Sequence, residues 1–473
     1  MTGTFASDSM APASLRARVR VAPMLPAGGR PGGAAGAPTP DRNPLQLLWS
    51  PHAARGSSHG GPELPPEPAG IAPYSGGLAS GLTASGVDVS VITTFPHYPA
   101  WSFGDARPPS SAVTTEIGCA VHRLRHRLPA RPGGVSRLLS EVSFGLHAVS
   151  RRWARHDVLV LVSPALFSSA IALVRARLFS RGTPVVTWVQ DIYSLGLRET
   201  GSGTGPAERF VAAIERWVLK RSSTVVVIHD RFMETVVEEF GVPASRVTVM
   251  RNWTHVEPPE FVDRVGARAS LGWAPDETIV LHAGNMGVKQ GLGNVVEAAR
   301  SVQDRGLPIR FVLLGDGNQR ESLQQQAAGI DSLQFLAPLP DDEFAAALNS
   351  ADVLLVNEAP GISGMAVPSK LTTYFATGVP VLAASDEGSV TRAEVLAANA
   401  GIVVDAGRPT RLVDGVLSLI RDPTARERYG RDARNYRAAH LTAAAAIDRF
   451  KSILHVLLPD RFESGSADKT GTN

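Results

Sequence analysis

Cysteine is almost absent from the sequence: Cys119 is the one cysteine in 473 residues. A single thiol can neither close an intramolecular disulfide nor supply the several thiolates of a structural zinc site. This excludes a disulfide-stabilised scaffold, and it fits a protein of a reducing compartment.

Long hydrophobic runs are missing as well. The longest uncharged apolar run, VLVLVSPALFSSAIALV at residues 158–174, is short for a membrane span, and Ser163-Pro164 interrupts it. We interpret it as a buried strand, a turn and the start of a helix. The N-terminal region lacks the continuous apolar core of a signal peptide. We therefore expect a cytoplasmic protein, either free or at the inner face of the cytoplasmic membrane.

Excess charge of one sign is small, because 47 Lys and Arg stand against 44 Asp and Glu and leave a net charge of +3. Proteins that bind nucleic acid usually carry a basic block or stripe. The sequence has no Lys/Arg-rich block with interleaved aromatic residues, and no D-x-D cluster for a divalent ion. We expect no nucleic-acid partner, no metal and no resident cofactor.

What the sequence does contain is a regular alternation of β-rich and helical runs, in residues 45–254 and again in residues 255–440. Such alternation predicts right-handed βαβ units around a parallel sheet. The predicted fold class is therefore α/β, with two doubly wound Rossmann-like domains facing a cleft.

The ends of the chain differ from this pattern. Residues 1–44 are rich in Gly, Ala and Pro, and we expect a disordered extension there and a disordered tail at residues 461–473. The run from Glu427 to Leu458 is interpreted as one long final helix. Its part at residues 441–460 is expected to pack back toward the first domain.

A glycine-rich turn, LHAGNMGVKQGLG, joins a strand and a helix of the second domain through Gly284, Gly287 and Gly291. Glycine allows close backbone approach, and the free amides at a helix start suit a diphosphate. Lys289 adds a positive charge to this turn. A plain strand-to-helix turn remains the alternative.

The turn LLGDGNQ is similar, with Gly315 at the end of a strand and Asp316 placed to cap the next helix. It is more typical of structure than of function, although it lies on the same side of the sheet.

The segment VPSKLTTYFATG predicts a short helix that Ser369 caps and Gly378 ends. The residues Leu371, Tyr374 and Phe375 share one apolar face. Lys370 does not fit this structural account, because the positive end of a helix repels cations. A phosphate bound there would balance the charge, and the two interpretations stay open.

In the first domain, polar residues follow two predicted strands. His97 and Tyr98 lie in the loop TTFPHYPAW, and Gln190 and Asp191 follow the strand PVVTWV directly. A loop histidine is often only structural, and a carboxylate after a strand can cap a helix. The carboxyl end of a parallel strand is nevertheless where ligands bind in such folds.

Together these motifs resemble those of retaining glycosyltransferases of family 4, which have the two-Rossmann GT-B architecture, and especially the branch that builds colanic acid and related capsular or exopolysaccharides. The motifs are PPEPAGIAPYSGGLASGL, VITTFPHYPAW, VQDIYSLGLRETG, RNWTH, AGNMGVKQGL, LLGDG and VPSKLTTYFATGVPVLAA. They occur in a consistent order between Glu63 and Leu457.

The resemblance implies a hexosyltransferase that moves a sugar from a nucleotide sugar to a polysaccharide or a lipid-linked saccharide. The catalytic residues that it implies are Asp191, His97, Lys289 and Lys370. The implied donor-binding residues are Gly284, Asn285, Gly287, Gln290, Gly315, Ser369, Leu371 and Thr373. The implied acceptor-side residues are Gly70, Tyr98 and Gln190.

The chain departs from the family pattern at several of these positions. Met365 and Thr373 replace the two glutamates of the E-x7-E pattern, and one hydroxyl cannot accept from both ribose hydroxyls as a carboxylate can. Gln190 replaces a histidine. The segment LQLLW is available as the first strand, but the insertion at residues 50–64 puts the central pairing of the first sheet in question.

The implied chemistry leaves negative charge on the departing diphosphate. Lys289, Lys370 and the helix-start amides would stabilise that charge without a metal. Retention in the family is ascribed to attack from the face of the leaving group, with the phosphate taking the proton of the acceptor.

A basic segment suggests where a lipid-linked acceptor would approach. Its arginines are Arg123, Arg125, Arg127, Arg131 and Arg137, next to an amphipathic helical run. Such a segment can rest on anionic lipid, so a peripheral membrane contact is expected. A solvated basic loop is the alternative.

Two other functions are compatible with the same fold. One is a nucleotide-sugar epimerase, although few acidic groups occur in the motifs that would face the sugar. The other is a non-catalytic nucleotide-sugar-binding homologue, suggested by Thr373 and Gln190. The donor base, the donor sugar, the acceptor, the stereochemistry of the linkage and the oligomeric state are not specified by these residues.

Overall fold

The computed structural model describes residues 45–48, 71–97, 102–103, 107–129, 134–199, 205–253, 262–362 and 369–459, with the backbone alone at Leu45–Leu48 and at a few helical positions. The predictions of disordered ends at residues 1–44 and 461–473 lie outside this part of the chain. So do Gly70, Tyr98, Arg131 and Met365.

The first sheet has eight strands among the described residues, in the order β3-β4-β2-β1-β5-β6-β7-β8. Neighbouring strands are parallel, except for the antiparallel pair β3 and β4. The strands are β1 (Leu45–Leu48), β2 (Val89–Thr94), β3 (Ser111–Glu116), β4 (Cys119–Leu124), β5 (Val158–Val162), β6 (Val185–Val189), β7 (Thr224–Val227) and β8 (Val247–Val249).

The segment LQLL forms the central strand of this sheet. Leu45 is in register with Val89 on one side and with Val158 on the other. The insertion at residues 50–64 therefore does not displace the first strand, because the strand pairs before the insertion begins.

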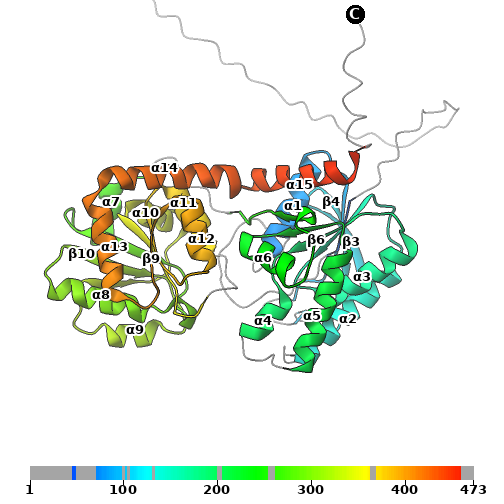
Figure 1. The fold of residues 1–473 in the computed structure, drawn as a ribbon, viewed down its shortest axis with the longest axis horizontal. Helices are drawn as coiled ribbons and strands as arrows, with labels where there is room; N and C mark the ends of the chain where they lie inside the picture. Colours follow the sequence, from blue (N-terminus) through cyan, green and yellow to red (C-terminus); the bar gives the residue numbers. More distant parts are fainter. Residues whose placement is uncertain are drawn as a thin grey trace, which may run out of the picture. The chain divides into compact units, whose positions relative to one another are not determined.

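Helices cover both faces of the first sheet (Figure 1). Alternate residues of one strand enter different clusters: Val158, Val160 and Val162 pack with α1, whereas Leu159 and Leu161 pack with α2 and α3. The helices are α1 (Ala72–Ala84), α2 (Gly134–Ser150), α3 (Leu166–Phe179), α4 (Tyr193–Glu199), α5 (Pro206–Arg221) and α6 (Asp230–Glu238).

The second sheet is parallel, with the strand order β11-β10-β9-β12-β13-β14 in the described chain. This is a doubly wound order, as predicted. The strands are β9 (Thr278–Ala283), β10 (Ile309–Leu314), β11 (Leu333–Leu336), β12 (Val353–Asn357), β13 (Val381–Ala384) and β14 (Gly401–Val404).

The helices after the first sheet are α7 (Arg264–Ser270), the 3-10 turn η2 (Val288–Gln290), α8 (Gly293–Asp304), α9 (Arg320–Gln326), α10 (Asp341–Ser350), α11 (Ser369–Thr377), α12 (Val390–Ala397), α13 (Pro409–Arg421), α14 (Pro423–His440) and α15 (Ala443–Leu457). Two short elements among them, η2 and α11, border the carboxyl edge of the second sheet. The predicted apolar face of α11 is confirmed, since Leu371, Tyr374 and Phe375 are all buried in the core.

The final helical run is divided, so the prediction of one long helix was wrong. The hydroxyl of Thr442 accepts a hydrogen bond from the amide of Ala445 and starts α15 as a new helix. The residues Ala446, Phe450, Ile453 and Leu454 of α15 belong to the same buried cluster as Leu78 and Leu82 of α1. The predicted limits of the domains themselves stay a prediction.

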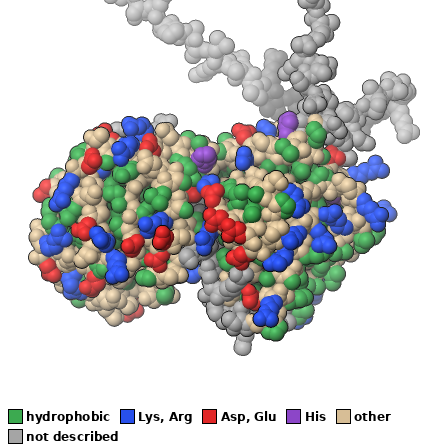
Figure 2. Space-filling view, in the orientation of Figure 1, with side chains coloured by type: hydrophobic (Ala, Val, Ile, Leu, Met, Phe, Trp, Pro, Cys, Tyr) green, Lys and Arg blue, Asp and Glu red, His purple; other side chains and the backbone are tan. Residues whose placement is uncertain are grey.

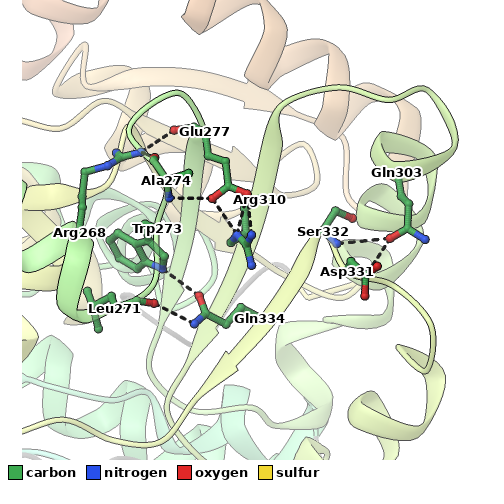
Figure 3. Close-up of polar contacts among 10 residues, drawn as sticks. All are labelled: Arg268, Leu271, Trp273, Ala274, Glu277, Gln303, Arg310, Asp331, Ser332 and Gln334. Atoms are coloured by element: carbon green, nitrogen blue, oxygen red, sulfur yellow. Dashed lines mark hydrogen bonds and ion pairs between the residues drawn. The ribbon is translucent and has the colours of Figure 1, made fainter.

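Polar side chains fasten the amino-terminal edge of the second sheet (Figure 3). Arg310 on β10 forms a two-pronged ion pair with Glu277, at 2.6 Å for its closest contact. The indole of Trp273 donates to the amide of Gln334, which donates in turn to the carbonyl of Leu271. These contacts lie opposite the carboxyl-terminal edge of the sheet, where ligands bind in such folds.

Candidate active site

The strand order of the second sheet places a topological switch point at β9, whose neighbours are β10 and β12. Ligands bind at the carboxyl ends of strands at such a point. The segments that leave these ends are residues 284–291 after β9, residues 315–317 after β10 and residues 357–359 after β12.

The glycine-rich turn after β9 is clamped to the segment after β12. Gly291 has a φ of 55°, and a Cβ there would lie 2.7 Å from the Cα of Ala359. The amide of Ala359 donates to the carbonyl of Lys289 at 2.9 Å, and the side-chain amide of Asn357 donates to the carbonyls of Gln290 and Gly291. The turn is therefore held in one shape before any ligand binds.

Gly284 and Gly315 allow two turns and a lysine to approach closely. A Cβ on Gly315 would lie 2.1 Å from the carbonyl oxygen of Gly284, and a Cβ on Gly284 would lie 3.5 Å from Nζ of Lys370. The structure thus brings together three residues that the resemblance implied for the donor side.

Lys370 occupies a half-buried position at the start of α11, where its Nζ lies 3.3 Å from Nε2 of the buried His282. Burial lowers the pKa of Lys370 to about 8, against the opposing attraction of Glu358. Burial and the charge of Lys370 hold the pKa of His282 well below its usual range. The imidazole is therefore neutral, and its Nε2 accepts from the ammonium group of Lys370.

Glu358 is a functional candidate that sequence reasoning missed. It follows β12 directly, is half-buried, and accepts hydrogen bonds from the hydroxyls of Ser389, at 2.7 Å, and Thr391. Burial raises its pKa, which the two hydroxyls and Lys370 oppose. The same signal that singled out Asp191, a carboxylate directly after a buried strand, would have found it.

Other donor-side residues have more ordinary surroundings. Lys289 is exposed, and the side-chain oxygen of Gln290 accepts from the amide of Gly287 at 3.0 Å, so that it shapes the turn. The side chain of Leu371 is 1% exposed, which leaves only its backbone for a ligand. Thr373 is half-buried, Asn285 is exposed, and Ser369 is the first residue of α11.

In the first half, His97 lies at the carboxyl end of β2 but is only 3% exposed. Its Nδ1 lies 3.0 Å from the carbonyl oxygen of Phe95, and its ring packs edge-on against His126 at a centroid distance of 4.8 Å. Burial, with a smaller effect of His97, lowers the pKa of His126 to about 3. The imidazole of His126 is therefore neutral at physiological pH.

Gln190 and Asp191 lie at the carboxyl end of β6. The side-chain amides of Gln190 and Asn252 hydrogen-bond each other twice, at 3.0 and 2.8 Å. The hydroxyl of Ser163 accepts from the backbone amides of Gln190 and Asp191 and donates to the carbonyl of Asp191. These bonds tie the ends of β5, β6 and β8 together.

Two arginines of the basic segment, Arg123 and Arg125, are bound by other groups of the protein. Arg123 lies on β4, a strand that the sequence analysis did not predict, and its guanidinium pairs with Glu116 at 2.6 Å and donates to the carbonyl of Thr94. Arg125 donates to the carbonyl of Pro108. The β3–β4 hairpin turns these arginines toward the protein, while Arg127 stays exposed.

No group of three or more His, Cys, Asp or Glu side chains in the described part of the chain is arranged to hold a metal ion. None of the described helices is both long and apolar enough to cross a membrane.

Family models match both halves of the chain. Residues 69–253 match the glycosyl transferase 4-like domain, and residues 263–436 match the glycosyl transferases group 1 domain. WcaI of Escherichia coli (strain K12), a glycosyl transferase named for colanic acid biosynthesis, is 32% identical over 66% of this chain and 79% of its own length. The chain belongs to glycosyltransferase family 4.

Another curated relative is a glucosyltransferase, and solved structures share the fold. The 2-deoxystreptamine glucosyltransferase of Streptomyces kanamyceticus is 26% identical to this glycosyltransferase over 65% of the chain and 78% of its own length. Sucrose-phosphate synthase from Thermosynechococcus elongatus has a TM-score of 0.64 at 16% identity, over 88% of this chain and all of its own. Anabaena HepE, solved with UDP, has a TM-score of 0.60 at 14% identity, over 87% of this chain and all of its own. The fold of the glycosyltransferase is GT-B.

Proposed function

We propose that this glycosyltransferase moves a sugar, with retention, from a nucleoside diphosphate sugar to a saccharide or polyprenyl-linked saccharide acceptor. The observation that carries the proposal is the position of Lys370, which contacts His282 beside Gly284 at the carboxyl edge of the second sheet and is attracted by the charge of Glu358. A half-buried ammonium group next to a glycine turn suits a diphosphate, which supplies the missing negative charge.

Relatives support this choice of donor. HepE has been solved with UDP and with UDP-glucose, so a uridine diphosphate sugar is the first donor to test. The name of WcaI points to colanic acid, an exopolysaccharide, as the kind of product to expect.

The proposed chemistry assigns a separate task to each part of the site. The amides of Val288 and Lys289 and those at the start of α11 bind the diphosphate, because most other amides of residues 284–291 donate within the protein. Lys370 and Lys289 balance the charge that grows on the diphosphate as the anomeric bond breaks. The leaving phosphate takes the proton of the attacking acceptor hydroxyl. Because these groups supply the positive charge, the reaction proceeds without a divalent ion and without a resident cofactor.

Glu358 takes the place of the carboxylates that Met365 and Thr373 replace. Each of its oxygens accepts one hydroxyl bond, from Ser389 or Thr391, and a carboxylate oxygen can accept a second. Glu358 accepts these further bonds from hydroxyls of the donor.

On the acceptor side, Asp191 and Gln190 lie at the end of β6, and Tyr98 and Gly70 are assigned to this side by the resemblance. Asp191 orients the attacking hydroxyl in this proposal. His97 positions the loop rather than transferring a proton, because it is buried against His126.

The experiment is nucleotide binding by the full-length protein, followed by hydrogen–deuterium exchange. UDP, GDP and their sugars are screened by thermal shift, and the nucleotide that stabilises most is expected to protect the backbone around Gly287 and Ser369. Incubation with the matching nucleotide sugar and an acceptor extract is then expected to yield a glycoside.

Failure of every nucleotide to protect these two segments would contradict the proposed donor site. Nucleotide release with an inverted free sugar and no glycoside would favour epimerase chemistry. Binding without turnover on any acceptor would favour a non-catalytic role.

A further inference from the structure

Arg251 joins the first half of the chain to the second through its side chain. It lies just after β8, and its Nε donates to Oε1 of Glu394 on α12 at 2.8 Å. Its Nη2 donates to Asp230 at the start of α6 at 2.5 Å. The side chains of Arg251 and Glu394 are only 16% and 8% exposed. Loss of either partner would leave a largely buried charge without compensation.

Tyr436 of α14 adds two contacts to this ion pair. Its hydroxyl donates to the same oxygen of Glu394 at 2.9 Å, and the guanidinium of Arg251 lies 5.6 Å from the centre of its ring. The ring of Tyr436 also packs edge-on against Phe375 of α11, at a centroid distance of 6.1 Å. Figure 2 shows acidic and basic side chains next to each other over the region where Figure 1 labels α6 and α12.

The helix α12 carries Glu394 and also reaches the donor side. Ser389, its N-cap, and Thr391 in its first turn donate their hydroxyls to Glu358. Glu394 follows within the same short helix, which moves as a rigid element. A group that holds Glu394 therefore also determines where the two hydroxyls beside Glu358 lie.

The next residue in the chain, Asn252, contacts the acceptor side. Its side-chain amide hydrogen-bonds that of Gln190 twice, and Gln190 immediately precedes Asp191 at the carboxyl end of β6. Two neighbouring residues thus connect to opposite sides of the proposed reaction. Asn252 binds the acceptor side, and Arg251 binds the helix that contacts the donor side.

We propose that Arg251 is a positioning residue for glycosyl transfer, which through Glu394 holds α12, and with it Glu358, in place against the acceptor side. The inference rests on the proposed function, in which Glu358 binds the donor and Asp191 orients the acceptor hydroxyl. Transfer needs the anomeric carbon and the attacking oxygen in one geometry, and a misplacement of about 1 Å can cost about 100-fold in rate. Because Arg251 acts through Glu394, its loss lowers the rate of transfer and leaves nucleotide binding unchanged.

The first experiment measures transfer by the full-length protein, from the nucleotide sugar that the thermal-shift screen selects to the acceptor extract. Arg251→Gln is expected to lower the apparent kcat at least about tenfold, while the KM for the donor and the affinity for UDP or GDP stay within about twofold. Glu394→Gln is expected to lower kcat too, and the double variant by less than the product of the single effects, since both break one contact. Arg251→Lys keeps the charge and is expected to retain more of the rate than Arg251→Gln.

A second measurement needs neither donor nor acceptor. Spin labels on Arg127→Cys in the first half and Gln324→Cys in the second, both exposed positions, report the distance between the halves by electron paramagnetic resonance. Cys119 is buried and stays unlabelled. Arg251→Gln is expected to broaden the distribution of distances, because it removes an ion pair that joins the halves.

The matched control is Arg392→Gln, also on α12, because Arg392 pairs with Asp405 within the second half at 3.4 Å. It is expected to keep both the rate and the distances of the wild type. Rates are measured well below the unfolding midpoint of each variant, so that a loss of stability alone leaves them unchanged. A wild-type kcat or an unbroadened distribution in Arg251→Gln, or an equal loss of rate in Arg392→Gln, would overturn the proposal.

The two proposals of this section fail in different ways. If neither UDP nor GDP binds the wild type, the donor site is wrong, and the spin-label distances still test the contact of Arg251 with Glu394. If the nucleotide binds and Arg251→Gln weakens its affinity enough to explain the slower transfer, Arg251 belongs to the donor site and is not a positioning residue.

Discussion

At the scale of single residues, Lys370 holds its charge in a half-buried position. Desolvation lowers its pKa to about 8, and a bound diphosphate would raise it again. Above about pH 8 the free protein has lost the proton of Lys370, and binding of a diphosphate is therefore coupled to the uptake of one proton.

UDP affinity is expected to stay constant just above pH 7 and to fall by up to about tenfold per pH unit above pH 8. Lys370→Gln should bind more weakly at neutral pH and show a flat profile, because the titrating group is gone. Lys370→Arg should keep the affinity to higher pH, since arginine does not deprotonate in this range. Isothermal calorimetry across pH measures these profiles, with Lys289→Gln as the control that keeps the wild-type slope. An unchanged slope in Lys370→Gln would assign the titration to another group.

Glu358 is expected to distinguish the parts of the donor. Glu358→Gln keeps the shape and one acceptor oxygen but loses the charge, so the affinity for the nucleotide sugar should fall by about 1.5–3 kcal/mol, the contribution of a hydrogen bond to a charged group. If the affinity for UDP falls by the same amount as the affinity for the nucleotide sugar, the carboxylate binds the ribose. If only the affinity for the nucleotide sugar falls, the carboxylate binds the sugar. The control is Glu394→Gln on α12, outside the donor turns. Unchanged affinity for both ligands would mean that Glu358 only accepts the hydrogen bonds of Ser389 and Thr391 at the start of α12.

At the scale of elements, the clamp between the glycine turn and the end of β12 fixes the donor site before a ligand arrives. Asn357 is 1% exposed and bonds Gln290, Gly291 and Asn294. The side-chain amide of Asn357 hydrogen-bonds two backbone carbonyls and the side chain of Asn294. Its removal therefore leaves several polar groups without these hydrogen bonds.

Asn357→Ala is therefore expected to lower the free energy of unfolding by about 1–3 kcal/mol and to speed amide exchange in residues 287–291. Hydrogen–deuterium exchange and chemical denaturation check both effects. Asn349→Ala on α10, which loses one bond within its own helix, is the matched control and should change stability by less than about 0.5 kcal/mol. Unaltered exchange in the turn would show that Gly291 and Ala359 hold it without Asn357.

Local sequence signals were sufficient to predict most helices and strands, but they failed for the strands β3 and β4 and for the break between α14 and α15. Buried strands such as β5 and β12 are continuous apolar runs, and their prediction was confirmed. β3 was missed because SAVTTE is a polar strand at the sheet edge with no buried position, and β4 because CAVHRL places His122 and Arg123 among its buried residues. The break between α14 and α15 was missed because a single capping residue, Thr442, decides it.

At the scale of the whole molecule, the last helix completes the core of the first sheet. Phe450 of α15 is fully buried among residues of α1 and of the central strands. A Cβ on Gly81 of α1 would lie 2.0 Å from Cδ1 of Ile447, so the two helices approach closely there. The helix α15 is thus part of the core of the first half.

Phe450→Ala is expected to lower the free energy of unfolding by about 3–5 kcal/mol, because it removes a buried ring and leaves a cavity. Val456→Ala, at a position that is 81% exposed on the same helix, should change it by less than about 0.5 kcal/mol. Denaturant unfolding followed by circular dichroism compares the two variants. A loss as small for Phe450→Ala as for Val456→Ala would mean that α15 does not contribute to this core.

The sequence by itself determined the alternation of strands and helices, the parallel sheets and the glycine turns, because these depend on periodicity and on backbone geometry within a few residues. Only the tertiary structure decided which charges are available. Glu358, His282 and Lys370 are far apart in the chain, and only the packing of β9, β12 and α11 makes them one electrostatic group. Arg123 was predicted as surface charge and is instead paired with Glu116, because an ion pair depends on a partner that the pattern around one residue does not reveal.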